Sequence, residues 1–149
     1  MSLEKQLLED MKAAMKSGDK LRLETIRSLR AQLKNAQIEK GGELSEEEQI
    51  QVLMKAAKKR KESIEQFRAV GREDRAQIEA QELAIIEAYL PQQMSEDEIS
   101  RLVDQIIQEV GATSPRDMGR VMGTIMPKVK GRADGKLVQQ IVKDKLSRL

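Results

Sequence analysis

The side chains with the clearest chemical potential are basic and lie close together near the carboxyl terminus: Lys128, Lys130, Arg132 and Lys136. They surround the predicted start of the last helix, where Asp134 is the expected N-cap. The free backbone N–H groups of a helix start attract anions, and nearby positive charge strengthens that attraction. The capping carboxylate of Asp134 would occupy part of the same space. Because no aromatic residue lies nearby for base stacking, such a site would recognise phosphates or shape.

The positive charge is concentrated in the last quarter of the chain. Residues 116–149 hold nine basic and three acidic side chains, a net charge of +6, whereas the whole chain carries +2. An excess of that size attracts polyanions, and we include Arg120 in the candidate set. The alternative is a solvated helix face, which is also the simplest interpretation of a second basic cluster, Lys55–Lys61. The role of that second cluster stays open.

Two glycines, Gly119 and Gly123, lie four residues apart in a predicted helix. Each costs about 1 kcal/mol relative to alanine in a helix interior. Two such costs in a short helix suggest that something approaches closely at this face. The neighbour is either another helix of the same chain or a partner protein that docks there.

Several kinds of chemistry are excluded because the chain has no His and no Cys. Imidazole bases, thiolate nucleophiles, structural zinc sites and disulfides are therefore absent. The acidic runs Glu46–Glu48 and Glu96–Glu98 fall in first helical turns, where carboxylates compensate the helix dipole. Serines such as Ser45 and Ser95 are expected to be helix caps, since no residue offers itself as their base. We predict no catalytic residues, no metal and no cofactor.

Start and stop signals divide the chain into helical segments, and no alternating pattern predicts a strand. The first predicted helix ends at Ser17–Asp19, and a longer one ends at Gly41–Gly42. The capping box Ser45–Glu48 begins the next. Residues 46–90 then form either one bent helix or two, interrupted at Gly71.

Pro91 ends this first half, because proline disfavours helix at the preceding residue. The capping box at Ser95–Glu98 begins a further helix, and Ser114–Asp117 is another start signal with proline at the first helical position. The apolar stripe Met118–Met126 follows, and the helix is predicted to stop at Pro127.

The chain is therefore predicted to be all-α, with an N-terminal helical hairpin or bundle and a small three-helix C-terminal domain. The predicted domains are residues 1–90 and 91–149. The core must be built from aliphatic side chains and methionine, because the only aromatic residues are Phe67 and Tyr89. The expected inward faces include Met15 and Ile78.

No apolar run approaches the roughly 20 residues that span a bilayer. The amino-terminal stretch contains Glu4, Glu9 and Asp10, which is not typical of a signal or transit peptide. We expect a cytoplasmic protein without a membrane contact.

The stretches Asp117–Gly123 and Met126–Gly135 resemble the signature of the YqeY family. The resemblance extends to residues 3–15, Arg60–Phe67 and Glu87–Pro91, and thus to nearly the whole chain. That family is similar to the tail region of the B subunit of the tRNA-dependent amidotransferase. The resemblance implies two helical domains, the second related to that tail and able to engage tRNA by its folded shape. In the amidotransferase the chemistry lies outside the tail.

The leading hypothesis is a bacterial, non-catalytic tRNA-binding or tRNA-metabolism accessory protein that contacts phosphates through Lys128, Lys130, Arg132, Lys136 and Arg120. Its partners would be tRNA or a protein of the tRNA aminoacylation and amidation pathway. The alternative is a helical adaptor that docks a partner through Gly119 and Gly123. A third hypothesis is an enzyme with carbon–nitrogen ligase activity and glutamine as amido-N-donor, for which the residues offer no support.

Overall fold

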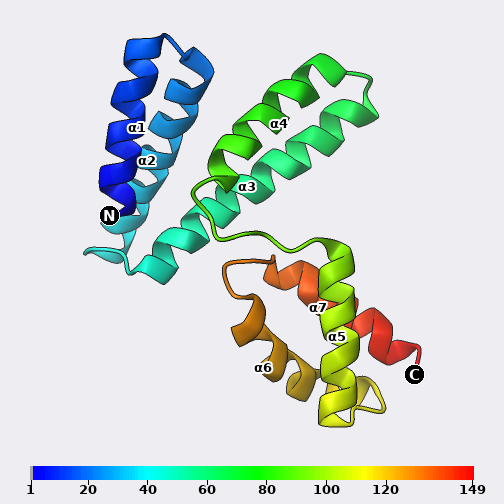
Figure 1. Cartoon of the computed structure of the whole chain (residues 1–149). Coiled ribbons are helices and arrows are strands. Elements are labelled where there is room, and N and C mark those ends of the chain that lie inside the picture. The colour runs from blue at the N-terminus through cyan, green and yellow to red at the C-terminus, as the bar shows by residue number, and fades with distance from the viewer. Residues whose placement is uncertain (1) are drawn as a thin grey trace. The chain divides into compact units, whose positions relative to one another are not determined.

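The structure is a computed structural model that describes residues 2–149. These residues form seven α-helices and one short 3-10 helix, with no β-strand among them (Figure 1). The predicted all-α fold is confirmed. The helices are α1 (Leu3–Ser17), α2 (Lys20–Lys40), α3 (Glu46–Ala69), α4 (Glu73–Glu87), α5 (Glu96–Val110), the 3-10 helix η1 (Pro115–Asp117), α6 (Met118–Val129) and α7 (Gly135–Ser147).

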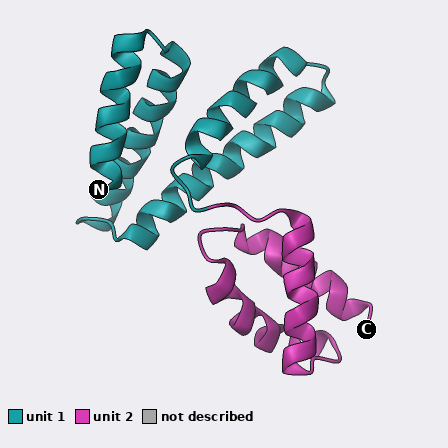
Figure 2. Cartoon of the chain, viewed as in Figure 1, with its two compact units in different colours: residues 1–91 teal, residues 92–149 magenta. Residues whose placement is uncertain are grey.

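The chain forms two compact units, which Figure 2 shows in different colours: residues 1–91 and residues 92–149. We call them unit 1 and unit 2 and describe each by itself. That residues 1–90 and 91–149 are domains able to fold separately stays a prediction.

Unit 1 consists of two helical hairpins, α1–α2 and α3–α4 (Figure 1). In the first, Gly18 ends α1 in the left-handed conformation and Asp19 caps α2 with its side chain. Residues 46–90, left open by the sequence, form two helices that turn back at Val70–Arg72. The largest fully buried side chains of the shared core are aliphatic: Leu7, Ile26, Leu29, Leu53 and Ile86.

Unit 2 packs α5, α6 and α7 against one another around a single aliphatic core. The predicted capping box at Ser95 is present at the start of α5, and Gly111 ends that helix. The predicted start at Ser114 is also present, although its first turn is the 3-10 helix η1. The fully buried residues come from all three helices: Val103 and Ile106, Val121, Ile125 and Val129, Val138 and Val142.

The predicted end of α6 at Pro127 is wrong, because the helix continues to Val129. A proline there removes the hydrogen bond to the carbonyl oxygen of Gly123. Both residues are exposed, so water can reach that carbonyl group. The Val129 side chain is fully buried in the core, and we attribute the last helical turn to that packing.

Two residues expected to face inward are instead exposed, Met15 at 54% and Ile78 at 45% of their surface. Both lie near the edge of an apolar stripe, where helical periodicity predicts least clearly whether a side chain faces the core or the solvent.

Within residues 2–149, no helix combines the length and the apolar character that crossing a bilayer requires.

Candidate nucleic-acid interface

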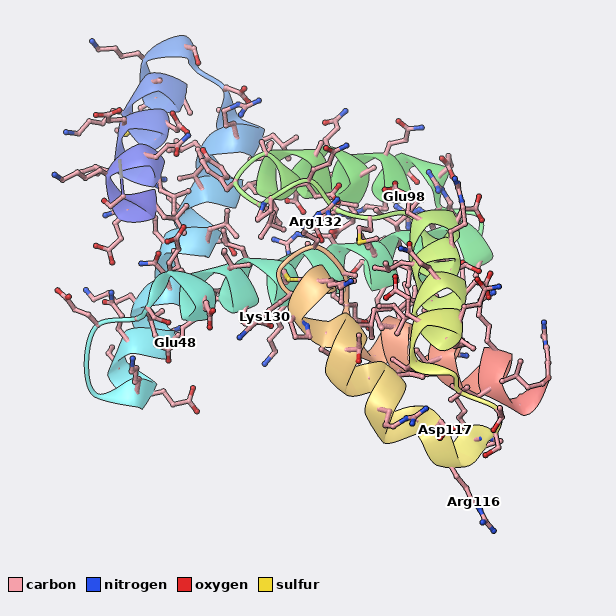
Figure 3. The ribbon with its side chains drawn as sticks, turned by 60° about the horizontal axis from the view of Figure 1, so that its bottom comes forward. Glu48, Glu98, Arg116, Asp117, Lys130 and Arg132 are labelled. Carbon is pink, nitrogen blue, oxygen red and sulfur yellow. The ribbon has the colours of Figure 1, made fainter. Side chains whose placement is uncertain are left out.

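Four of the predicted binding residues lie together in unit 2, at the turn between α6 and α7. Lys128 is in the last turn of α6 and is exposed, and Lys130 is the C-cap of that helix. Arg132 follows in the turn and is half-buried, and Lys136 is exposed in the first turn of α7. Figure 3 labels Lys130 and Arg132 in this turn. The sequence prediction that these residues are neighbours of a helix start therefore agrees with the fold.

Arg132 has a structural role that the sequence did not indicate. Its Nε donates a hydrogen bond to the carbonyl oxygen of Gln92 at 2.9 Å, and its own carbonyl oxygen accepts one from the Met94 backbone N–H at 2.8 Å. The Gln93 side chain adds a third bond, from Nε2 to the carbonyl oxygen of Gly131 at 2.9 Å. These three bonds, which we call the strap, hold the segment 92–94 against the α6–α7 turn.

Asp134 is the N-cap of α7, as predicted, and its Oδ1 accepts a hydrogen bond from the Lys136 backbone N–H at 3.4 Å. The carboxylate thus occupies part of the helix start. An approaching anion would meet the lysine side chains around the turn before it met the free backbone N–H groups of α7.

Arg120 is not brought together with the other candidates. It lies in the first turn of α6, where its Nη2 donates to the carbonyl oxygen of Val110 at 2.5 Å and its Nε is 3.8 Å from Asp117 Oδ1. The first contact satisfies a carbonyl group in the last turn of α5. Arg120 therefore fastens α5 to α6 at the end of unit 2 away from the basic turn.

Asp117 holds the loop that leads into α6. Its Oδ2 accepts hydrogen bonds from the backbone N–H groups of Thr113 at 2.8 Å and of Ser114 at 3.2 Å. These bonds, the Thr113 bond above all, and the positive charge of Arg120 lower the pKa of Asp117 below its usual value. The carboxylate is a local staple for this loop.

Lys128 and Lys136 differ from the arginines because, within residues 2–149, their side chains take part in no hydrogen bond or ion pair. Lys145, by contrast, pairs with Asp104 of α5 at 2.9 Å. Arg116 is exposed in η1 and points away from unit 2 in Figure 3. The +6 excess of the C-terminal segment is thus partly neutralised by α5 and partly spread over both ends of the unit.

A groove in unit 2 shows one basic residue that sequence reasoning missed, Arg101 of α5. Its side chain lines the same surface as Lys128 and Arg132, together with the carboxylate of Glu98. Glu98 is already engaged, since it completes the cap with Ser95. Arg101 precedes Lys128 by 27 residues in the sequence, so no local spacing could have grouped the two.

Two residues of the basic cluster Lys55–Lys61, Arg60 and Lys61, contact α4 from α3. Arg60 Nε lies 3.0 Å from Glu82 Oε2 and 3.6 Å from Glu79 Oε2, and Lys61 lies 4.0 Å from Glu87. Burial and the neighbouring Glu82 charge raise the pKa of Glu79, and the positive charge of Arg60 lowers it in part. The prediction of a solvated helix face is therefore wrong for Arg60, which is mostly buried between α3 and α4.

The expectation that a helix of the same chain approaches Gly119 and Gly123 is wrong for the described residues. Both glycines are exposed, and apart from the chain neighbours and the backbone of the same helix, no heavy atom would lie within 4 Å of a Cβ atom added to either. Their cost to the helix is therefore not offset by close packing within unit 2. The face remains open to a partner.

The acidic runs at the starts of α3 and α5 form capping boxes with Ser45 and Ser95, as predicted. Lys40 donates to the Glu48 carboxylate at 2.5 Å, and this bond together with those from Ser45 lowers the pKa of Glu48 to about 2. Among residues 2–149, no group of three potential ligand side chains is placed to hold a metal ion.

Comparison with known proteins gives relatives of two kinds. The chain is 32% identical over 130 residues to altered inheritance of mitochondria protein 41 of Pyrenophora tritici-repentis, which covers 86% of this chain and 71% of that protein. It is 37% identical over 112 residues to the protein of the same name in Lachancea thermotolerans, with 73% and 60% covered. The second kind of match is shorter: the E subunit of the glutamyl-tRNA(Gln) amidotransferase of Thermococcus gammatolerans is 40% identical over 60 residues.

That last match covers 38% of this chain and only 10% of the amidotransferase protein. A model of the family described as Yqey-like protein matches residues 4–146, and the sequence resemblance is thereby confirmed: the chain belongs to the YqeY-like family.

Proposed function

We propose that this chain is a non-catalytic tRNA-binding accessory protein, which contacts tRNA phosphates through the lysines of the α6–α7 turn. The observation that carries the proposal is the 60-residue similarity to a protein named as part of an amidotransferase for glutamyl-tRNA(Gln). Proteins that share such a stretch share a small folded module, and the stretch is too short to include all of unit 1.

The geometry of unit 2 supports a phosphate contact. Lys128 and Lys136 are exposed and unpaired among the described residues, and Arg101 and Arg132 add positive charge to the adjoining groove. Flexible lysines without a carboxylate partner can follow a phosphate backbone at little cost. With no aromatic platform nearby, binding would depend on backbone charge and on the folded shape of tRNA.

We do not extend the proposal to ammonia transfer. The matched stretch is one tenth of the amidotransferase protein, and the name of that protein describes the whole assembly. Purified chain incubated with glutamine and misacylated tRNA should form no amidated product.

The test is a titration of unfractionated tRNA with the full chain at several salt concentrations. The variant Lys128→Ala/Lys136→Ala should bind about tenfold more weakly at low salt. The slope of log K against log salt concentration should become shallower by about 2, since two phosphate contacts are lost. Arg132 is left intact because its removal would also break the bond of the strap to Gln92.

A matched control replaces two exposed lysines of α1, Lys12→Ala/Lys16→Ala, and should leave both affinity and slope unchanged. Equal binding by the unaltered chain and by Lys128→Ala/Lys136→Ala would place the site elsewhere. Failure of the unaltered chain to bind tRNA at low salt would overturn the function itself.

A second candidate function, docking of a protein partner at Gly119 and Gly123, is favoured by the open space above both glycines. A partner from the tRNA aminoacylation and amidation pathway would offset their cost to the helix. Gly119→Leu/Gly123→Leu should abolish capture of such a protein after nuclease treatment while the helix content stays unchanged. Capture that survives the substitution would rule out this face.

We also propose that the protein works in a bacterial cytoplasm. The fungal relatives carry a mitochondrial location in their names, so cell fractionation is the direct measurement. Recovery of the chain with membranes would contradict the proposal.

A further inference from the structure

A second functional candidate lies in unit 1, in a groove between α1 and α2. Figure 1 shows these two helices side by side at one edge of the unit. The accessible apolar lining of the groove comes from Leu8, which is half-buried, and Ala31, which is exposed. Beneath them, Leu7 and Leu33 belong to the core and are buried. The floor of the groove is therefore apolar.

The apolar row continues past both ends of the groove. Met15 follows Leu8 by seven residues on α1, and Ile38 follows Ala31 by seven on α2, so each lies about two turns further along the same side of its helix. Met15 is 54% exposed and Ile38 is 69% exposed. These two side chains extend the exposed apolar surface of the hairpin beyond both ends of the groove.

The rim of the groove is basic. Lys5, Arg27 and Lys34 are exposed and, within residues 2–149, their side chains take part in no hydrogen bond or ion pair. Arg30 contacts the sulfur of Met11 at 3.3 Å and keeps its charge. The only carboxylate that lines the groove belongs to Glu4, which accepts a hydrogen bond from Gln37. Four cationic side chains and one carboxylate thus line a groove whose floor is apolar.

We propose that this groove docks an acidic amphipathic helix of a partner protein. Such a helix would lay its apolar side chains on Leu8 and Ala31 and direct its carboxylates to the lysines and arginines of the rim. The lining residues of α2 extend from Arg27 to Gln37, about 15 Å along the helix axis, which corresponds to about three turns of a bound helix.

Two other occupants fit less well. A bilayer is flat and would reach the protruding Met15 and Ile38, but it would not fill the groove between α1 and α2 in which Leu8 is half-buried. A nucleic acid would find cations, but the groove has an apolar floor and no aromatic side chain on which a base can stack. An acidic amphipathic helix can pack its apolar side chains on the floor and place its carboxylates beside the cations of the rim. This inference concerns unit 1 and does not depend on tRNA binding by unit 2.

The experiment titrates the full chain with a synthetic 15-residue peptide that carries Leu at helical spacing on one face and Glu on the others. A peptide of the same composition in scrambled order serves as the control ligand. In NMR spectra of the labelled chain, the amphipathic peptide should shift the signals of Leu8, Ala31 and Lys34, and the scrambled peptide should bind at least about tenfold more weakly.

Two charge-reversal variants distinguish peptide binding by unit 1 from tRNA binding by unit 2. Arg27→Glu/Lys34→Glu should weaken peptide binding by about tenfold or more at low salt and leave tRNA binding unchanged. Lys128→Glu/Lys136→Glu should leave the peptide unaffected. Circular dichroism checks that both variants stay folded, and Ala31→Gln changes the floor without altering charge if the first variant unfolds.

The proposal is overturned if the scrambled peptide binds as well as the amphipathic one, if the shifted signals lie outside the groove, or if neither peptide binds. It is also overturned if vesicles of phosphatidylserine and phosphatidylcholine, or an oligouridylate, bind the groove more tightly than the peptide does.

Discussion

In unit 1, Arg60 and Lys40 contact carboxylates of a neighbouring helix and Arg30 contacts the sulfur of Met11, whereas two arginines of unit 2 bind backbone carbonyl oxygens. In unit 1, Arg60 pairs with Glu79 and Glu82, and Lys40 pairs with Glu48. In unit 2, Arg120 donates to Val110 and Arg132 donates to Gln92. Carboxylate pairs occur in both units, since Lys145 pairs with Asp104 in unit 2, but these two arginines of unit 2 have a backbone carbonyl oxygen of another segment as acceptor.

The type of acceptor determines whether the positive charge of the arginine or lysine is neutralised. A carboxylate both accepts the hydrogen bond and cancels the positive charge, while a carbonyl group accepts the bond and leaves the charge in place. Arg132 is therefore structural and still contributes to the positive field beside Lys128. A basic cluster in a sequence says how many cations there are, and only the fold says which ones are neutralised.

The strongest test of this comparison is the removal of Arg60 in unit 1. Its side chain and those of its two partners are mostly buried, with exposures of 14%, 24% and 20%. Arg60→Ala should lower the free energy of unfolding by about 2 kcal/mol, because two adjacent carboxylates lose their counter-charge. Urea unfolding at pH 7 measures this loss, and the exposed neighbour substitution Lys59→Ala should cost less than about 0.5 kcal/mol.

The same variant predicts a pH dependence. The pKa of Glu79 is already raised by burial and by Glu82, and the loss of Arg60 would raise it further. A carboxyl group with a raised folded pKa favours the folded state below its unfolded pKa and loses that advantage as the pH rises. The deficit of Arg60→Ala should therefore shrink between pH 7 and pH 4. A deficit that stays constant would mean that the lost contact is packing.

The corresponding test in unit 2 is Arg132→Ala, which should cost about 1 kcal/mol through the lost bond to Gln92. Lys128→Ala, in the same groove, should be neutral within about 0.5 kcal/mol. Both variants lose one positive charge, so both should weaken tRNA binding. If the two variants unfold at the same urea concentration, the bond from Arg132 to Gln92 does not stabilise the unit.

The open glycine face predicts a gain in stability. Gly119→Ala and Gly123→Ala should each stabilise α6 by about 0.5–1 kcal/mol, because alanine is the better helix former and no heavy atom beyond the chain neighbours and the helix backbone lies within 4 Å of the added methyl group. Gly131→Ala is the opposite control, because Gly131 has a φ angle of 78° and its replacement should destabilise the unit by about 1 kcal/mol. Thermal unfolding followed by circular dichroism distinguishes the three.

The smallest expected effects come from two partly exposed carboxylates, Glu48 in unit 1 and Asp117 in unit 2. Both have lowered folded pKa values, Glu48 to about 2, chiefly through Lys40 for Glu48 and through the backbone N–H of Thr113 for Asp117. Each contribution is present above the unfolded pKa of roughly 4 and is lost as the pH falls through the folded value. Glu48→Gln and Asp117→Asn should differ from the parent at pH 7 and converge with it near pH 2.

The parts of the fold that the sequence predicted are those set by a few adjacent residues. Ser45 and Ser95 each cap the helix that follows, and Gly18 and Gly111 each end one, because the partners of these groups lie within four or five residues. Pro127 is the exception. Its local preference is to end the helix, and the burial of Val129 two residues later overrides it.

The candidate site could be predicted only in part. The lysines were grouped correctly with the start of α7, because sequence distance and spatial distance agree there. The roles of Arg120 and Arg132 depend on carbonyl groups 10 and 40 residues away. A carbonyl group has no sequence signature, since every residue carries one. Arg101 was missed for a related reason, because it enters the groove from a different helix.

The strap has a consequence for transplanting unit 2 into other proteins. A graft cut at Ser95, where α5 is capped, would discard the carbonyl acceptor of Gln92, the side-chain donor of Gln93 and the backbone donor of Met94. The exposed turn would then carry an arginine whose acceptor had been removed, beside backbone groups open to water. A chimaera built from residue 92 onward keeps all three bonds of the strap.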